Sequence, residues 1–267
     1  MGLYDVIDEI AKKDITKTET GDSRILGVVI GEVVKNHSET LPGRVCVTVP
    51  IRDKEANELK WARVAMPSSG KDWGHYFLPE IGDQVLVAFE QGNIEKPFII
   101  GCVPKDADSF FKKSQDKDNN IKRIVTRHGS TLRFDDSDDG EKEKITLETA
   151  GEAHIIVLDN EKKTISIKNK DGSCGMEMNT EKGTIEIKDD KKITIKSGDS
   201  QIIMDGNSKS ILIKADSIEL KATKSLKLSS DGETKVSGQA VTAEATGQAL
   251  NLKSGTSVSF SAPSISM

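Results

Sequence analysis

Long apolar runs, a basic leader and closely spaced cysteines are all missing from this 267-residue sequence. No stretch approaches the 18 apolar residues that a membrane-spanning helix needs. The first residues, MGLYDVIDEIAKKD, carry acids where a secretory signal has a basic end and an apolar run. We therefore expect synthesis in the cytoplasm without a signal peptide.

The cysteines and histidines give no pattern for a disulfide framework or a metal site. Cys46, Cys102 and Cys174 are odd in number and widely spaced. Cys46 and Cys102 lie in strand-like runs, so we expect both to be buried thiols. Metal-ligand spacing is also missing from the histidines, which are His37, His75, His128 and His154. No metal or cofactor is expected.

No concentrated positive charge is present either. Residues 24–104 hold nine Lys/Arg and ten Asp/Glu, and residues 121–267 hold 22 and 23. A nucleic-acid-binding protein needs a concentrated basic face. The sequence therefore gives no support for nucleic acid as a partner.

Aromatic residues and prolines are scarce after the first 111 positions. Nine of the eleven aromatic residues lie at or before Phe111, and six of the seven prolines at or before Pro104. This asymmetry predicts two architectures in one chain. We expect the first to use bulky residues in a compact core, and the second to be too thin to hold them.

The amino-terminal part, residues 1–23, is predicted to be a short helix and a linker. Within residues 3–13, apolar side chains recur at helical spacing. A lone helix of about three turns is marginal in water, so it is expected to dock onto something. Residues 14–23 are the linker.

Residues 24–104 are predicted to form a small β-barrel. Five β-rich runs alternate with Gly, Pro and charged turns: ILGVVIGEVV, GRVCVTVP, KWARVAM, DQVLVAFE and PFIIGCV. Five strands in about 80 residues without a regular repeat suit an OB-type barrel. Residues 105–120 are predicted to be an interdomain linker.

From about residue 145 the sequence becomes a series of short alternating units such as TISIK, TIEIK, ILIK and LNLK. The units recur about every 8.6 residues between Ile145 and Ile265, which indicates a repetitive β architecture. Eight or nine residues supply one strand and one bend, whereas a single-chain β-helix needs longer coils. We therefore predict that residues 145–267 wind with two other copies into an intertwined triple-stranded β-helix. Charged side chains lie on its wet face.

One stretch resembles the OB-domain motif of the VgrG and phage baseplate spike family (baseplate assembly protein V). Its elements are W-x-R-V, G-x3-G-x4-P, G-D-x-V-L-V-x-F and P-x-I-x-G. They fall on Trp61, Arg63, Val64, Gly70, Gly74, Pro79, Gly82, Asp83, Val85, Val87, Phe89, Asn93, Pro97, Ile99 and Gly101. A second block, STLRFDDSDDGEKEKITLET, looks like the hairpin that precedes the shaft in these spikes, so residues 121–144 are assigned to a hairpin collar.

The resemblance implies an all-β homotrimer that serves as the non-enzymatic, membrane-piercing central spike of a contractile injection machine. Such machines include phage tails, tailocins, and type VI or extracellular injection systems. Longer family members carry a hub region before the OB domain, and about 23 residues precede it here, so a separate baseplate hub protein is implied. The 16-residue linker is too short for the lysozyme domain that some spikes carry. The target membrane is met only transiently.

Two docking surfaces are predicted. Lys253 is the last charged side chain, and exposed apolar ends usually need a partner. We expect a PAAR-type tip protein to bind the carboxyl-terminal end, at Val258, Phe260, Ile265, Ser266 and Met267. The hub-binding face of the first helix is predicted to consist of Leu3, Ile7 and Ile10, although packing within the spike's own trimer is an alternative.

Other interpretations of the same sequence remain open. The DDSDDG segment begins like a calcium loop, but Ser137 and Thr146 occupy ligand positions, so a solvated turn is expected. A trimeric adhesin or tail-fibre shaft would need a terminal head. A polysaccharide-degrading β-helix enzyme would need long coils and a clustered acid pair.

Overall fold

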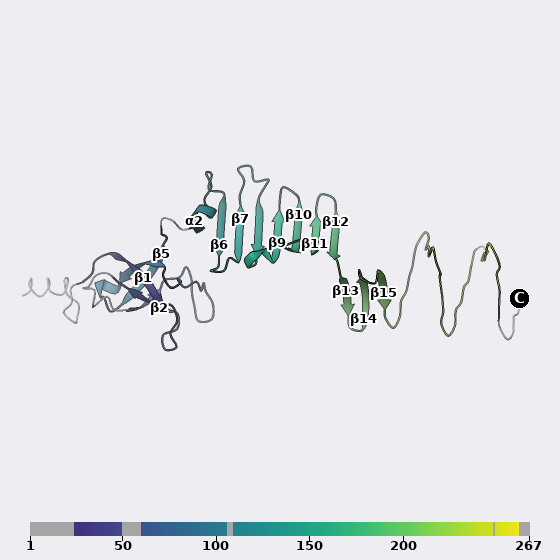
Figure 1. The fold of residues 1–267 in the computed structure, drawn as a ribbon, viewed down its shortest axis with the longest axis horizontal. Helices are drawn as coiled ribbons and strands as arrows, with labels where there is room; N and C mark the ends of the chain where they lie inside the picture. The colour runs from purple at the N-terminus through teal and green to yellow at the C-terminus, as the bar shows by residue number, and fades with distance from the viewer. Residues whose placement is uncertain (1–23, 50–59, 106–108, 248, 262–267) are drawn as a thin grey trace, which may run out of the picture. The chain divides into compact units, whose positions relative to one another are not determined.

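The computed structural model describes residues 24–49, 60–105, 109–247 and 249–261 (Figure 1). The chain divides into two compact units between Lys188 and Asp189, and each is considered by itself. The one α-helix in the described ranges is α2 (Ser109–Ser114), inside the stretch expected to be a linker. No helix in these ranges is long and apolar enough to cross a bilayer.

The predicted barrel is confirmed, and it closes on itself in the order β1-β2-β3-β5-β4. β3 and β5 pair in parallel, and the other neighbours pair antiparallel. Each expected run contains one strand. The strands are β1 (Val28–Lys35), β2 (Arg44–Thr48), β3 (Lys60–Val64), β4 (Gln84–Phe89) and β5 (Pro97–Val103), with a 3₁₀ turn, η1 (Glu90–Gly92), between the last two.

Small aliphatic side chains fill the barrel. Along β4, buried and half-buried residues alternate strictly, because every second side chain points into the barrel. Gly31 lies on the barrel's inner side, where a Cβ atom would stand 2.8 Å from the Thr48 carbonyl oxygen, so β1 and β2 approach too closely for a larger residue. The core consists of Val33, Val45, Val47, Val49, Ala62, Val85, Val87, Phe89, Ile94 and Ile99.

The expectation that bulky aromatic residues build this core is wrong. Phe89 is the one aromatic among the buried core residues of the described chain. Trp73, Tyr76 and Phe77 lie on the loop between β3 and β4 and are 67%, 68% and 62% exposed. In a closed barrel of five short strands, β-branched valines already fill the space between the walls.

The cysteine predictions are half right. Cys46 is buried in β2, as expected, and burial raises the pKa of its thiol. Cys102 is exposed, because it lies one residue before β5 ends, where the barrel opens to solvent.

After the barrel, seven strands form one antiparallel sheet in strict sequence order (Figure 1). The expected hairpin is confirmed by the pairing of β7 with β8. A 3₁₀ turn, η2 (Ala150–Glu152), joins β8 to β9. The strands are β6 (Ile121–Val125), β7 (Thr131–Asp135), β8 (Lys144–Glu148), β9 (His154–Asp159), β10 (Thr164–Asn169), β11 (Cys174–Asn179) and β12 (Thr184–Asp189).

A second, three-stranded antiparallel sheet follows. It is composed of β13 (Lys192–Ser197), β14 (Ser200–Asp205) and β15 (Ser210–Lys214), again in sequence order.

One turn design recurs between these strands. Asp159, Asn179 and Asp205 end β9, β11 and β14, and each side chain accepts a hydrogen bond from the backbone N–H three residues later, at 2.8–2.9 Å. One residue further on, the chain has a positive φ: 54° at Lys163, 64° at Gly183 and 52° at Lys209. This geometry returns the chain at once beside the strand that it has just left.

These hairpins correct the prediction for residues 145–214. Each strand there pairs with at least one neighbouring strand of the same chain. Beyond Lys214 the chain changes. In residues 215–247 and 249–261, the structure shows neither a strand nor a hydrogen bond between two backbone groups. The intertwined shaft stays a prediction for this distal segment, the name used below for residues 215–261.

The turn geometry predicts opposite effects for glycine at neighbouring positions. The left-handed conformation costs an L-residue about 1–2 kcal/mol, while glycine's extra freedom in the unfolded chain costs about 0.5–1 kcal/mol. Lys163→Gly is therefore expected to raise the free energy of unfolding by about 0.5–1 kcal/mol, and Gly183→Ala to lower it by about 0.5–1 kcal/mol. Urea denaturation at one fixed protein concentration measures both.

Lys162→Gly is the matched control, because Lys162 precedes the left-handed position. It should destabilise the protein by about 0.5–1 kcal/mol. Equal destabilisation by Lys162→Gly and Lys163→Gly would contradict the account of the turn.

Candidate functional site

The main candidate for a functional surface is one face of the seven-stranded sheet. Residues directly opposite each other on neighbouring strands place their side chains on the same face. The strand pairing thereby aligns two apolar rows across the sheet. One is Phe134, Ile145, Leu158, Ile165 and Met178; the other is Ile124, Leu132, Leu147, Ile156, Ile167 and Met176.

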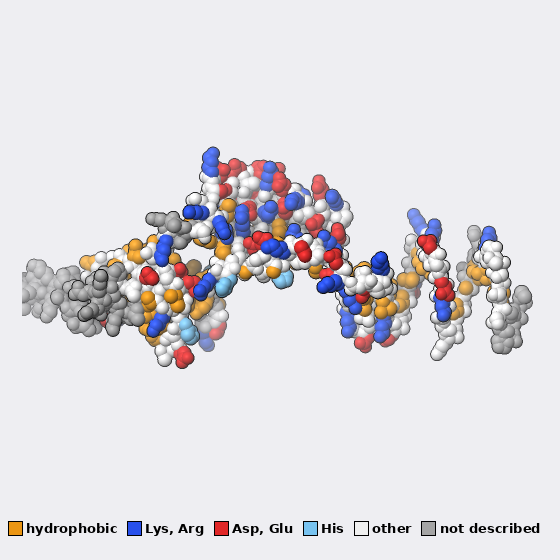
Figure 2. Space-filling model, in the orientation of Figure 1, with side chains coloured by type: hydrophobic (Ala, Val, Ile, Leu, Met, Phe, Trp, Pro, Cys, Tyr) orange, Lys and Arg blue, Asp and Glu red, His pale blue; other side chains and the backbone are white. Residues whose placement is uncertain are grey.

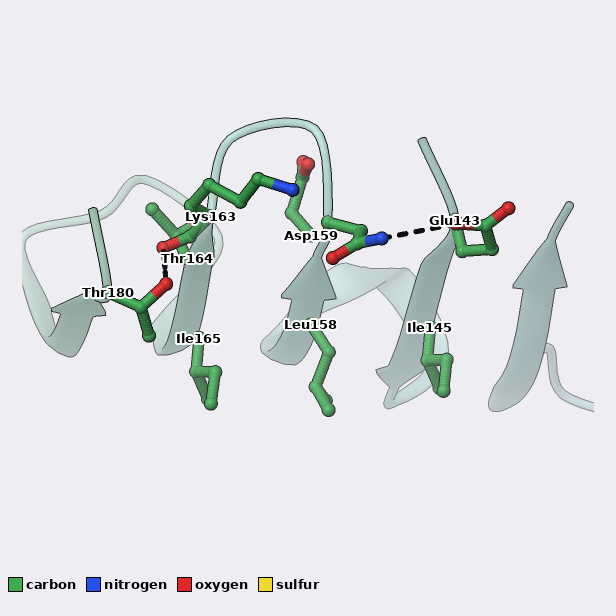
Figure 3. A pocket seen from close by; sticks show the side chains of 9 residues that line it. Glu143, Ile145, Leu158, Asp159, Lys163, Thr164, Ile165 and Thr180 are labelled. Carbon is green, nitrogen blue, oxygen red and sulfur yellow. Dashed lines mark hydrogen bonds between the residues drawn. The ribbon is translucent and has the colours of Figure 1, made fainter. Parts of the chain in front are cut away.

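Figure 3 shows the middle of the first row from close by: Ile145, Leu158 and Ile165 lie side by side and point the same way from β8, β9 and β10. Their outer ends contact no other part of the described chain closely enough to bury them. The large hydrophobic residues of this sheet that stay exposed are Ile124, Phe134, Ile145, Leu147, Leu158, Ile165, Ile167, Met176, Ile185 and Ile187.

The opposite face of the sheet is mostly polar. Its central row pairs Arg133 with Thr146 and Ser166 with Glu177. Arg133 also forms an ion pair with Asp135 on its own strand. The sheet thus has one wet face and one apolar face, as the alternation predicts.

Asp159 is the most buried carboxylate on this wet face, and its contacts are structural. Lys144 Nζ lies 3.6 Å from Asp159 Oδ2, and the Asp159 side chain is only 5% exposed. Burial alone would raise its pKa, but the backbone N–H of Lys162 and the charge on Lys144 outweigh burial and lower the pKa. The carboxylate is thereby kept ionised, and it ties the end of β9 to β8 and to the following turn.

The three-stranded sheet repeats the arrangement. Ile193, Met204 and Ile211 form one apolar row, and Ile195, Ile202 and Ile213 form the next. Figure 2 shows hydrophobic side chains gathered over β13–β15 and recurring along the chain that follows.

The distal segment continues the alternation without a sheet. Its exposed large hydrophobic residues are Ile218, Leu220, Leu226, Leu228, Val236, Val241, Leu250, Leu252, Val258 and Phe260. Of the predicted tip-binding residues, Val258 and Phe260 are 49% and 67% exposed. The rest lie outside the described residues: Ile265, Ser266 and Met267 at this end, and the hub-binding Leu3, Ile7 and Ile10 at the other.

The carboxylates of the DDSDDG segment, which begins like a calcium loop, accept hydrogen bonds within a turn. Ser137 Oγ lies 2.9 Å from both Asp139 Oδ1 and Glu143 Oε1, and its single hydroxyl hydrogen can be donated to either carboxylate. The backbone N–H of Glu141 and the Ser137 hydroxyl lower the pKa of Asp139. This is the solvated turn expected for DDSDDG. Within the described ranges no three His, Cys, Asp or Glu side chains are grouped as metal ligands.

The exposed aromatic loop of the barrel was missed from sequence. The sequence feature that could have predicted this loop is the pair Gly70 and Gly74, because two closely spaced glycines favour a turn over a strand. The backbone of this turn folds back on itself, and the Gly70 and His75 N–H groups donate to carbonyl oxygens across the loop. A residue in such a turn cannot reach the barrel interior.

Residues 29–103 match the family described as the type VI secretion system/phage-baseplate injector OB domain. The VgrG2a spike protein of the type VI secretion system of Pseudomonas aeruginosa is 33% identical over 107 residues, which are 37% of this chain. The VgrG1c and VgrG1a spike proteins of the same organism are 28% identical over 34% of the chain and 39% identical over 20%.

The chain spans only a small part of these relatives: 13% of VgrG2a, 14% of VgrG1c and 8% of VgrG1a. The match to the family falls on the closed five-stranded barrel and covers β1 to β5. Residues 29–103 are therefore similar to the OB domains of type VI secretion system and phage-baseplate injectors.

Proposed function

We propose that this chain is one protomer of a homotrimeric central spike, which passes the force of a contractile injection machine to a target envelope. The observation that carries the proposal is the unpartnered apolar face on β6–β12. Fully burying one large aliphatic side chain contributes about 1.5–3 kcal/mol. Ten such residues on one sheet therefore give a strong drive to associate.

Three copies fit this surface better than two. Two copies would pack face to face as a sandwich, which leaves the distal segment without a folded form. There, apolar pairs such as Leu226 with Leu228 and Leu250 with Leu252 recur at multiples of eight residues, enough for one strand and one bend. A three-sided prism uses one strand and one bend per side, and it covers the strand edges of every chain.

The two parts of the shaft then differ in construction. In the proximal part each chain contributes a whole sheet as one wall of the prism. In the distal segment each chain contributes single strands that hydrogen-bond to the other two chains, as an intertwined triple-stranded β-helix. Apolar side chains point inward in both parts, and the charged ones point outward.

The role is mechanical and not enzymatic. The carboxylates that could have formed a catalytic pair, Glu143 and Asp159, are held by Ser137 and Asn160 and by Lys144 and Lys162 respectively. The spike is assembled into the baseplate of the injection particle, and the family match on the barrel supports this placement over an adhesin shaft.

Light scattering of the purified full chain tests the trimer. A chain of 29.0 kDa is expected to give a particle of about 87 kDa, because three apolar walls must meet before the faces are covered. A mass near 29 kDa would overturn the proposed function, and a mass twice that value would replace the prism by a sandwich.

The carboxyl-terminal end is proposed to bind a PAAR-type tip protein through Val258, Phe260, Ile265, Ser266 and Met267. Deleting residues 262–267 is expected to abolish recovery of a co-expressed tip protein in a pull-down, because most of the uncharged residues proposed to bind it are removed. Lys253→Ala, which changes the last charged side chain, is the control and should leave recovery intact. Full recovery with the deletion would refute tip binding.

The amino-terminal residues Leu3, Ile7 and Ile10 are proposed to bind the baseplate hub protein. Replacing all three by Asp is expected to stop incorporation of the spike into particles, since the apolar face is lost. Lys12→Gln with Lys13→Gln is the control, because both changes spare that face. Normal particle assembly by the triple variant, seen by electron microscopy, would exclude hub docking.

A further inference from the structure

We propose that the seven-stranded sheet is the place where trimer assembly begins and where the register of the three chains is set, and that the distal segment assembles only afterwards. The inference rests on the proposed trimer. It adds an order to assembly and assigns the two parts of the shaft different tasks.

The sheet is built from local contacts of one chain. Neighbouring strands in the sheet from β6 to β12 are consecutive in sequence, so every hydrogen-bonded ladder closes over a short loop. Loop closure of this length costs little entropy, and hairpins form faster than any long-range pairing. Side chains also hold the loops in place: the Lys162 N–H, for example, donates a hydrogen bond to the Asp159 carboxylate. Each chain can therefore order this sheet before it meets another copy.

The distal segment has no such local help. Across residues 215–247 and 249–261, no backbone N–H donates to a backbone carbonyl. The few hydrogen bonds that occur there, such as those from the Thr256 and Ser257 N–H groups to Ser254 Oγ, stay within three residues. Ordering this chain costs conformational entropy at every residue, which is recovered only when partner strands are already beside it.

Because its sequence is repetitive, the distal segment does not by itself specify how the three chains align with one another. Shifting it by eight residues places Ile218 on Leu226 and Leu220 on Leu228, and likewise Leu250 on Val258 and Leu252 on Phe260. At these four positions an apolar residue meets an apolar residue in both registers. The same shift also places Leu226 on Thr234 and Val236 on Glu244, so the apolar pattern distinguishes the two registers at only a few positions, and such strands specify their alignment weakly.

The sheet is not ambiguous in this way. Its strands are held in register by their loops, and its apolar face is irregular in shape, with Phe134 and Met176 at defined places among aliphatic residues. Three such faces fit together in one alignment. Once the three sheets are packed together, the distal segments of the three chains start from equivalent positions. These fixed starting points select one register for the distal segment.

Matched double variants of the full chain test this order by light scattering and limited trypsin digestion. Ile165→Asp with Ile167→Asp places charges on the apolar face, and Lys168→Asp is its control on the wet face. Leu226→Asp with Leu228→Asp does the same in the distal segment, and Lys227→Asp is its control. All four variants retain the chain length and the loops.

The sheet double variant is expected to be monomeric. The distal double variant is expected to remain a trimer, with new trypsin cleavage at Lys221, Lys224 and Lys227. Both controls should behave as the unmodified protein. A monomeric distal variant, or a trimeric sheet variant, would overturn the proposed order. If the unmodified protein is itself a monomer, the proposed function fails, which is a distinguishable result.

Refolding rates keep the test decisive if the charged variants fail to fold. Ile167→Ala and Leu228→Ala each remove, without adding charge, most of an exposed apolar side chain that the proposed trimer would bury. A residue in the assembly nucleus slows formation, and one outside it mainly speeds dissociation. Trimer formation should be about tenfold or more slower for Ile167→Ala and within about twofold of the unmodified rate for Leu228→Ala. The reverse ranking, or equal slowing, would refute the inference.

Discussion

The alternation of apolar and polar side chains along a strand is the constraint on which this structure depends. A strand presents its residues to two faces in turn, so a sequence such as TISIK commits Ile165 and Ile167 to one face and Ser166 to the other. A barrel satisfies the constraint by closing around its own interior. A flat sheet cannot do so, and its apolar face stays in water until another surface covers it.

The two ways of meeting this constraint explain the composition of the chain. In the barrel, inward-facing positions are few and close together, so valines and two isoleucines fill most of them, and position 31 has room only for glycine. Phe89 is the one aromatic residue of this region in the buried core, whereas Trp73, Tyr76 and Phe77 lie exposed on a loop. The concentration of aromatic residues in the first 111 positions describes the barrel's outside as much as its inside.

Local pattern was enough to predict the strands but not their partners. The five barrel strands, the β7–β8 hairpin and the alternating units from β8 to β15 were all visible in the sequence. Alternation does not say whether a strand pairs with its own chain or with another, because both arrangements bury the same residues. Turn chemistry decides that question. Asp159 and Lys163 lie where a tight return needs a side-chain acceptor and a left-handed residue, whereas in residues 215–247 and 249–261 no loop returns the chain in this way.

In the proposed spike, this arrangement would also make a sheet of short strands suitable for bearing load. Strands β6–β12 lie side by side in one row, so their hydrogen bonds run along the row and not across it (Figure 1). A load along the row presses neighbouring strands together at their spacing of about 4.8 Å, where each carbonyl already contacts its donor, and it pulls no ladder open. A single sheet loaded in this way would bend toward one face. Covering the apolar rows of Leu158 and Ile167 with two further sheets removes that freedom, because bending any wall then requires the tightly packed interior to compress. In the proposed trimer, the interaction that would drive the chains together is thus the same one that would keep the assembled spike straight under load.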